Sequence, residues 1–192
     1  MVLRRQTQMN LEKSIAALRN GGTILYPTDT IWGIGCDATN EDACQEILKI
    51  KERPDEKSFI LLVDDFPMIE KYIPDFHQVC YDLADFATRP LTIIYPDAEG
   101  LAPSVLAADG SVGIRITKDP ICLKLIRSIR KPIVSTSANV SGTPSPSCFK
   151  DISDSIKLKV DAIVEERLKE KMTTPSQIIK IEKDGSVKII RS

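Results

Sequence analysis

Apolar runs of strand length alternate with helical patterns along this chain, and this alternation restricts the folds open to it. Leu11, Ile15 and Leu18 recur at helical spacing, and Gly21-Gly22 ends that pattern before an apolar run begins. Such alternation is typical of a layered α/β domain. The predicted helices cover residues 10–20, 41–50, 67–72, 75–88, 149–156 and a segment opening at 119–120, and the predicted strands cover 23–26, 58–63, 91–95, 112–116, 133–135, 160–164, 177–182 and 186–191.

Two of the helix starts carry their own signals. Thr39 and Asp42 resemble a capping box before the second helix. Asp119 and Pro120 fit an N-cap followed by proline at the first helical position. We therefore expect helices to begin close to both points.

The end of the sequence predicts a hairpin. Asp184-Gly185 lies between the last two strand patterns and is a type I′ turn signal. An antiparallel hairpin makes the sheet mixed rather than purely parallel. A length of 192 residues fits one domain, so we expect a single α/β domain over residues 1–192.

Composition excludes several classes of protein. Hydrophobic residues make up 42% and charged residues 28% of the chain, which is an ordinary globular balance. No apolar run approaches the ~18 residues that a membrane-spanning helix needs. The arginines near the N-terminus have no apolar stretch behind them, as a signal peptide would. We therefore expect a cytoplasmic protein.

The charge distribution is uneven. A net charge of −1 does not favour a broad nucleic-acid-binding surface. Residues 120–150, however, contain no Asp or Glu, and this segment can either attract anions or form a solvated helix face followed by a polar loop. Its basic residues are Lys124, Arg127, Arg130, Lys131 and Lys150.

The cysteines and the histidine do not favour a disulfide or zinc site. The five cysteines are odd in number and widely spaced, with no C-x-x-C pair, so we expect reduced, mostly buried thiols. His77 is the only histidine, and it fits a surface or structural residue in a helix better than a catalytic base. We expect no metal site made by the protein alone.

The glycine motifs are weak evidence for a nucleotide-binding loop. Gly33-x-Gly35-x-x-Ala38 fits the loose dinucleotide pattern, but six polar-turn residues separate it from the preceding strand. No glycine precedes a Lys-Ser or Lys-Thr pair as in a Walker A loop. Any ATP site must therefore be of another kind.

A short basic segment is a better candidate for phosphate binding. Pro54 pushes Arg53 out of helical geometry, so that Lys51 and Arg53 can point the same way from extended chain, with Lys57 close behind. Convergent cations suit a polyphosphate. Basic residues also commonly close a helix C-terminus, where the dipole favours them, and the sequence leaves both readings open.

A second candidate is the polar loop over residues 135–142. Ser135-Thr136-Ser137-Ala138-Asn139-Val140-Ser141-Gly142 directly follows a predicted strand, at the kind of position where α/β proteins bind ligands. Its hydroxyls and backbone N–H groups can approach an anion closely. The alternative is a polar turn with local side-chain–backbone hydrogen bonds.

These segments together resemble the YrdC-type threonylcarbamoyl-AMP synthase family in its short form. The resemblance runs from Gly21 to Arg191. It rests on GGTILYPTDTIWGIG, KERPDEKSFILLV, RPLTIIY, SVGIRI, STSANVSG and PSQIIKIEKDGSVKIIR. The resemblance implies an open, twisted, mixed α/β sheet with helices around it and a deep concave cleft.

The resemblance also implies a reaction and a set of site residues. The family joins L-threonine, bicarbonate and ATP into threonylcarbamoyl-AMP, releasing pyrophosphate, for the threonylcarbamoyladenosine base of tRNA. Lys51 and Arg53 carry the catalytic role. The implied ATP contacts are Lys51, Arg53, Lys57, Ser111, Ser137, Asn139, Ser145 and Arg191, and the implied L-threonine contacts are Thr30, Arg115, Ser135 and Ser176. Mg²⁺ would arrive with the ATP.

Departures from the family pattern leave rival interpretations open. Leu62 stands where many relatives carry a histidine that helps to hold threonine, Gln177 stands where threonine is usual, and Trp32 stands where tyrosine is usual. The rivals are a paralogue with another substrate and a module that binds double-stranded RNA or tRNA. A downstream threonylcarbamoyl-transferase complex is an expected partner of the enzyme.

The environment of Arg115 also has two readings. Strand alternation puts Gly113 and Arg115 on one sheet face, and a covered arginine there needs a carboxylate partner. That partner is either a protein Asp or Glu or, as the resemblance favours, the carboxylate of an amino-acid substrate.

Overall fold

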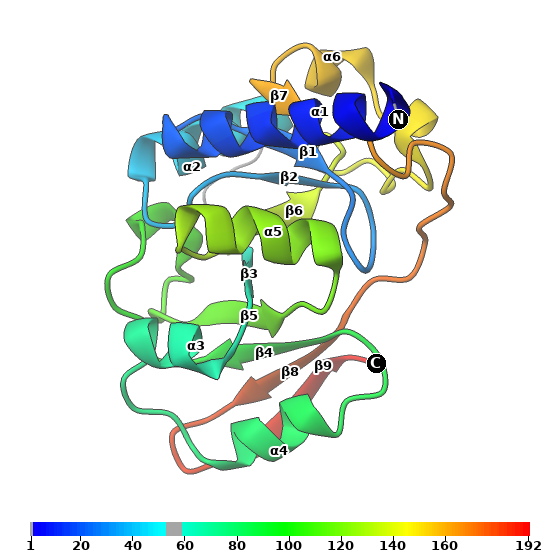
Figure 1. Cartoon of the computed structure of the whole chain (residues 1–192). Helices are drawn as coiled ribbons and strands as arrows, with labels where there is room; N and C mark the ends of the chain where they lie inside the picture. Colours follow the sequence, from blue (N-terminus) through cyan, green and yellow to red (C-terminus); the bar gives the residue numbers. More distant parts are fainter. Residues whose placement is uncertain (1, 53–58) are drawn as a thin grey trace.

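The computed structural model describes residues 2–52 and 59–192, with side chains from residue 10 onward, and it contains a mixed sheet flanked by helices (Figure 1). The strands are β1 (Ile24–Tyr26), β2 (Gly33–Gly35), β3 (Ile60–Val63), β4 (Leu91–Tyr95), β5 (Val112–Ile116), β6 (Ile133–Ser137), β7 (Ala162–Ile163), β8 (Gln177–Ile181) and β9 (Val187–Arg191). The helices are α1 (Val2–Arg19), α2 (Glu41–Lys51), α3 (Phe66–Tyr72), α4 (Val79–Asp85), α5 (Pro120–Ile129) and α6 (Asp154–Lys157), with 3-10 turns η1 (Pro103–Val105) and η2 (Phe149–Asp151). None of the helices in the described ranges has the length and hydrophobicity of a membrane span.

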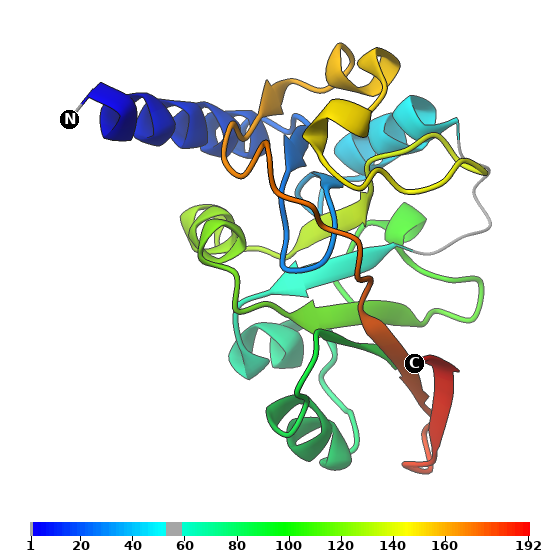
Figure 2. The same ribbon diagram turned by 90° about the vertical axis from the view of Figure 1, so that its right-hand side faces the viewer.

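The sheet has the strand order β7-β1-β2-β6-β3-β5-β4-β8-β9 in the described residues. Three neighbouring pairs are parallel, β1/β7, β3/β5 and β4/β8, and the other five are antiparallel. This confirms the mixed sheet predicted from the sequence. The segment between β7 and β8 crosses over the strands and joins the two ends of the sheet (Figure 2).

Two apolar clusters cover the two faces of the sheet. Helices α1 and α5 lie side by side over one face, where Tyr26, Leu62 and Ile133 are buried against them (Figures 1 and 2). The larger cluster lies on the other face and includes Leu61 and Ile114. Neighbouring Leu61 and Leu62 are both fully buried in different clusters, which is the alternation that a strand covered on both faces requires.

The two predicted helix starts have different outcomes. Helix α5 begins as expected, since one carboxylate oxygen of Asp119 accepts hydrogen bonds from the backbone N–H groups of Ile121 at 2.9 Å and Cys122 at 3.0 Å. Helix α2 is capped by Asn40, whose side-chain oxygen accepts from the N–H of Ala43 at 3.2 Å. The predicted capping residue Thr39 instead donates its hydroxyl to Asp37, so that part of the prediction is wrong.

Other elements differ from the sequence prediction, among them α1, which begins at Val2 rather than at residue 10. The helix predicted over 75–88 is only Val79–Asp85; its N-cap residue Gln78 makes no side-chain capping hydrogen bond, and Nδ1 of His77 accepts the N–H of Val79 at 3.2 Å. The helix predicted over 149–156 is interrupted by extended backbone at Ile152, with φ −72° and ψ 132°, and forms η2 and α6. The sequence predicts no strand at β2, because two of its three residues are glycines, which have low strand propensity.

The final hairpin is present, but its turn is not type I′. Gly185 has φ 81°, whereas Asp184 does not have the positive φ that type I′ also requires. The N–H of Gly185 donates to the carbonyl of Glu182 at 2.9 Å, and the N–H of Glu182 donates to Ser186 at 3.0 Å. This pattern fits a three-residue loop with one left-handed glycine.

The glycines of β2 allow close packing of the sheet, not a dinucleotide loop. A Cβ on Gly35 would lie 2.5 Å from the carbonyl oxygen of Val134 and 2.7 Å from the ring of Tyr26. A Cβ on Gly33, in the same strand, would meet nothing closer than 3.4 Å.

We expect Gly35→Ala to lower the free energy of unfolding by about 1–3 kcal/mol, because the added methyl group overlaps a backbone carbonyl and a buried ring. Chemical denaturation measures this change. Gly33→Ala is the matched control and should cost much less. Equal losses in the two variants would contradict the packing role of Gly35.

Candidate functional site

A pocket of about 370 Å³ opens on the sheet and gathers residues from distant parts of the chain. Seven of the predicted site residues line it, including all four predicted threonine contacts: Thr30, Arg115, Ser135, Ser137, Ser145, Ser176 and Arg191. The remaining lining residues include Ile31, Gly33, Phe59 and Ile60. The fold therefore brings most of the residues that the sequence singled out to one place.

Strand register brings the pocket residues together. Ile60 on β3 pairs with Gly113 on β5 and with Ser135 on β6, so these three share a sheet face with Arg115. Farther along the same face Leu62 pairs with Arg115, and there α5 covers the sheet. The pocket is the part of this face that the helices leave open.

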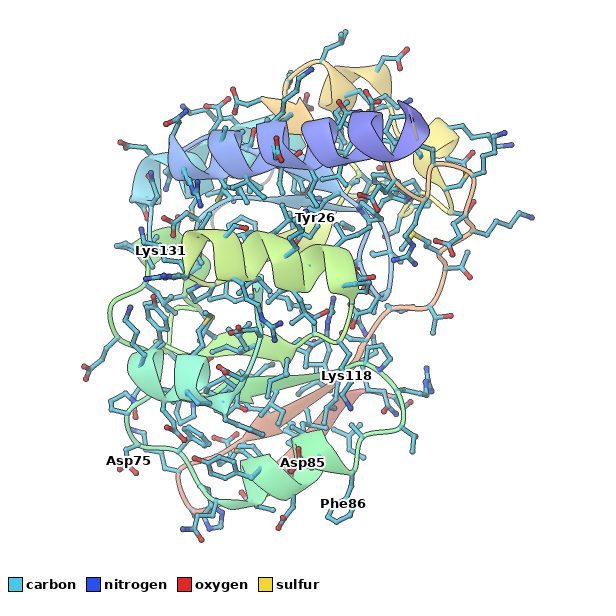
Figure 3. All side chains as sticks on the ribbon, in the orientation of Figure 1. Tyr26, Asp75, Asp85, Phe86, Lys118 and Lys131 are labelled. Carbon is cyan, nitrogen blue, oxygen red and sulfur yellow. The ribbon has the colours of Figure 1, made fainter. Side chains whose placement is uncertain are left out.

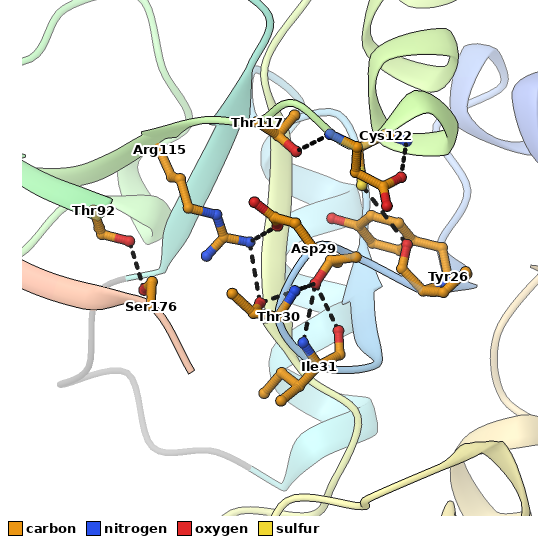
Figure 4. A network of polar contacts seen from close by, with 12 residues as sticks. Tyr26, Asp29, Thr30, Ile31, Thr92, Arg115, Thr117, Cys122 and Ser176 are labelled. Carbon is orange, nitrogen blue, oxygen red and sulfur yellow. Dashed lines mark hydrogen bonds and ion pairs between the residues drawn. The ribbon is translucent and has the colours of Figure 1, made fainter. Parts of the chain in front are cut away.

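Arg115 is the most buried charge in the pocket and has a protein partner. Its side chain is 3% exposed, and Nη2 lies 2.9 Å from a carboxylate oxygen of Asp29. The same nitrogen donates to the hydroxyl oxygen of Thr30 at 3.3 Å. Figure 4 shows Asp29 and Thr30 against the guanidinium. One nitrogen of the Arg115 guanidinium therefore pairs with a protein carboxylate, which is one of the two interpretations drawn from the sequence.

The rest of the guanidinium is available to a ligand. Both protons of Nη2 are used by Asp29 and Thr30. Within the described part of the chain, Nε is buried without a hydrogen-bond partner and Nη1 makes no hydrogen bond. A ligand carboxylate can therefore meet Nη1 or Nε, although Asp29 already occupies one nitrogen of a two-nitrogen fork.

A second arginine reaches the same pocket from the end of β9. Arg191 donates from Nε to the carbonyl of Ser176 at 2.9 Å and from Nη2 to the Ser176 hydroxyl at 3.3 Å. That hydroxyl also lies 2.8 Å from the hydroxyl of Thr92. Desolvation, followed by the charge of Arg115, lowers the pKa of Arg191 from its ordinary value. Two cations facing one pocket favour an anionic ligand.

Lys51 lies under the polar loop and does not line the pocket. It is 3% exposed, and its ammonium donates to the backbone carbonyls of Ser137 and, at 2.7 Å, Asn139. The carbonyl of Lys51 accepts the N–H of Ser141 at 2.9 Å. These contacts hold the loop against the end of α2, so Lys51 fixes the backbone that carries Ser137.

The loop is also braced from within. The side-chain nitrogen of Asn139 donates to the carbonyls of Val140 and Thr143. Its side-chain oxygen is buried and has no hydrogen-bond partner among the described residues. The structure thus gives Asn139 a loop-holding role, with one acceptor left over.

The other predicted ATP contacts are not gathered in the pocket. Ser111 precedes β5 at the opposite end from Arg115, and its hydroxyl donates to Asp109 at 2.6 Å. Arg53 and Lys57 lie outside the described residues.

Asp29 is the residue that the sequence did not single out. It belongs to the polar turn before β2, and nothing in the local sequence indicates a contact with a residue 86 positions later. The sequence indicated such a residue only indirectly, because a covered arginine on β5 requires an acidic partner elsewhere in the chain or in a ligand.

The cysteines and the basic side chains of residues 120–150 do not line the pocket. All five cysteines are buried and free. Groups of three or more His, Cys, Asp or Glu that could hold a metal are absent from the described ranges. In the basic segment 120–150, Arg127 pairs with Asp64 at 3.2 Å and Lys131 pairs with Asp37 at 2.6 Å. Figure 3 places Lys131 just past the end of α5.

Known proteins resemble this chain in both sequence and structure. A profile of the Sua5/YciO/YrdC family, described as "Telomere recombination", matches residues 16–192. The protein named threonylcarbamoyl-AMP synthase from Photobacterium profundum is 30% identical over 164 residues, covering 81% of this chain and 86% of that protein.

Two solved structures share the fold. P. abyssi Sua5 complexed with L-threonine matches with a TM-score of 0.79 and 26% identity over 88% of this chain, which spans only 50% of that longer one. E. coli YciO matches with a TM-score of 0.80 and 24% identity, covering 97% of this chain and 89% of that one. The second likeness is evidence of fold alone.

We expect Lys51→Met to loosen the loop over residues 137–141, because it removes an ammonium that donates to two loop carbonyls. Hydrogen exchange at the Ser141 amide should accelerate, and the melting temperature should fall. Lys49→Met is the matched control on the same helix, since the Lys49 side chain is 72% exposed. Unchanged exchange in Lys51→Met would contradict the loop-holding role.

Proposed function

The chain belongs to the Sua5/YciO/YrdC family, and on that premise we propose that it is a threonylcarbamoyl-AMP synthase. Such an enzyme joins L-threonine, bicarbonate and ATP and releases pyrophosphate, which makes it a nucleotidyltransferase. Its product supplies the threonylcarbamoyl group of the modified tRNA base t6A. The family resemblance drawn from the sequence motifs is confirmed by the family match.

One observation carries the proposal, the convergence of two kinds of anion contact in a single pocket. One part of the pocket contains Arg115 on β5, Thr30 from the turn before β2 and Ser176 just before β8. Ser137, the last residue of β6, and Ser145, from the loop that follows, line the same pocket. An amino-acid carboxylate at the first group and nucleotide phosphates at the second would bring the two reactants together.

We assign the site residues on this basis. Thr30, Arg115, Ser135 and Ser176 would hold L-threonine, and Ser137, Ser145 and Arg191 would contact ATP. Lys51 and Asn139 would act by holding the phosphate-binding loop. Arg53, Lys57 and Ser111 remain proposed ATP contacts.

The chemistry needs positioning more than a protein nucleophile. A carbamate formed on the threonine amine would attack the α-phosphate, and pyrophosphate would leave. The pocket would orient both reactants, while backbone N–H groups and hydroxyls of the loop over 135–142 would offset negative charge on the phosphates.

Mg²⁺ is proposed to enter with the nucleotide. No carboxylate of the described residues lines the pocket, and Asp29 behind Arg115 is paired with it at 2.9 Å. The polar side chains of the lining are serine and threonine hydroxyls and the guanidiniums of Arg115 and Arg191. Such a lining suits a Mg²⁺ ion held mainly by phosphate oxygens and water.

The RNA-binding alternative receives less support from the structure. Two of the five basic side chains in 120–150 are paired with carboxylates, Arg127 with Asp64 and Lys131 with Asp37. We propose that tRNA and a threonylcarbamoyl-transferase complex act after this protein, as acceptor and consumer of its product.

We expect pyrophosphate release to require L-threonine, bicarbonate and ATP together, and to stop when Mg²⁺ is removed. Coupled detection of pyrophosphate and mass detection of the adenylate product measure this. L-serine and L-valine serve as comparison substrates. Pyrophosphate release that is indifferent to the amino acid, or salt-sensitive RNA binding without turnover, would contradict the proposal.

We expect Arg115→Lys to raise the KM for L-threonine roughly tenfold, because a lysine can still pair with Asp29 but cannot present Nη1 and Nε to a carboxylate. The dissociation constant for ATP should change little, and the melting temperature should stay close to that of the wild type. Calorimetry with each ligand measures the split. Equal weakening of ATP and threonine would return Arg115 to a purely structural role.

A further inference from the structure

Asp29 lies between two pockets: it lines one of them, and it pairs with an arginine that lines the other. On one side lies Arg115, which lines the pocket of about 370 Å³ described above. On the other side Asp29 lines a second pocket of about 400 Å³, between the end of α4 and the start of α5. The Asp29 side chain is 19% exposed, so its charge is only partly solvated.

The hydrogen bonds around Asp29 fix the direction of Arg115. The Thr28 hydroxyl donates its only proton to the carbonyl of Ile31 at 2.7 Å. The Thr30 hydroxyl lies 2.9 Å from that of Thr28, and its backbone N–H donates to the Thr28 hydroxyl oxygen at 3.0 Å. The Thr30 hydroxyl oxygen accepts from Nη2 of Arg115 at 3.3 Å. The turn thus holds Arg115 with one carboxylate and one hydroxyl.

The charges at this end of the pocket nearly cancel. Arg115 and Asp29 form a neutral pair, and Arg191 adds one positive charge. Desolvation, followed by the nearby positive charge of Arg115, lowers the pKa of Arg191 from its ordinary value. Arg191 is the proposed ATP contact, so the amino-acid half presents the neutral Arg115–Asp29 pair, which can bind a carboxylate through the remaining guanidinium N–H groups without a large positive charge. A phosphate chain carries more charge and is matched better by two unpaired cations.

We propose that Asp29 is a positioning and specificity-determining residue of the amino-acid half of the site. Its carboxylate aims the free nitrogens of Arg115 into the pocket and offsets one positive charge, so that this half accepts a monoanionic carboxylate and discriminates against phosphate. The inference rests on the proposed function and adds how the amino-acid half selects a carboxylate over a phosphate.

A purely structural ion pair is the competing account. In that case Asp29 only compensates a buried guanidinium, and losing it would weaken every ligand and the fold together. The two accounts differ for phosphate. Asp29→Asn adds one net positive charge to the pocket, so selection by charge requires phosphate binding to strengthen while threonine binding weakens.

The experiment measures L-threonine and inorganic pyrophosphate binding by calorimetry in the full chain. The variants are Asp29→Asn, which removes the charge, and Asp29→Glu, which keeps the charge but moves it by one methylene. Asp85→Asn is the matched control, because Asp85 lines only the second pocket and lies at the end of α4 (Figure 3). Melting temperatures are recorded for all of them.

In Asp29→Asn we expect threonine affinity to fall roughly tenfold or more and pyrophosphate affinity to rise about twofold or more. Pyrophosphate should also become competitive with threonine in the turnover assay. Asp29→Glu should lose threonine affinity without gaining pyrophosphate affinity, and Asp85→Asn should match the wild type.

Parallel loss of both ligands in Asp29→Asn, or unchanged threonine affinity, would overturn the inference while leaving the proposed function intact. A wild-type protein that binds no threonine would overturn the proposed function, and this inference with it. If Asp29→Asn does not fold, Asp29→Glu decides alone, because a structural pair predicts equal losses for the two ligands.

Discussion

A guanidinium buried on a β-sheet is the interaction on which the rest of this site depends. Removing a charged side chain from water is costly unless a partner of opposite charge and further hydrogen bonds compensate it. Arg115 is 3% exposed, and its partners Asp29 and Thr30 both come from the turn between β1 and β2. The need to satisfy one arginine therefore fixes the turn against β5. That arrangement leaves the rest of the guanidinium facing the pocket.

Lys51 meets the same physical demand at another part of the site in a different way. Its buried ammonium donates to the carbonyls of Ser137 and Asn139. Carbonyl oxygens at a strand end would otherwise need water or other donors. A buried cation thus organises each half of the site, one through a carboxylate and the other through backbone. In both cases the charged residue shapes a neighbouring segment that then meets the ligand.

The sequence predicted what depends on local pattern and missed what depends on distant contacts. Strand β5 and the start of α5 lie where the sequence put them, because a buried apolar run and an Asp-Pro cap are local signals. Strand β2, rich in glycine, gave no such signal. Motif resemblance named four threonine contacts that do line one pocket. It could not show that Lys51 lies beneath its loop, or that Asp29 pairs with Arg115, since both depend on contacts more than 80 residues apart.

The position of Arg191 couples ligand binding to the least protected part of the sheet. Strand β9 is the edge strand, all five of its residues are exposed, and it pairs only with β8. Segments with few buried contacts open at low free-energy cost. Yet Arg191 reaches the pocket only when this hairpin is formed, through its bonds to Ser176. An anion that binds Arg191 must therefore stabilise the hairpin, because opening the hairpin would lose the free energy of that binding. Formation of the β8–β9 hairpin is thus linked to occupancy of the pocket, although no other element covers its outer edge in the described residues.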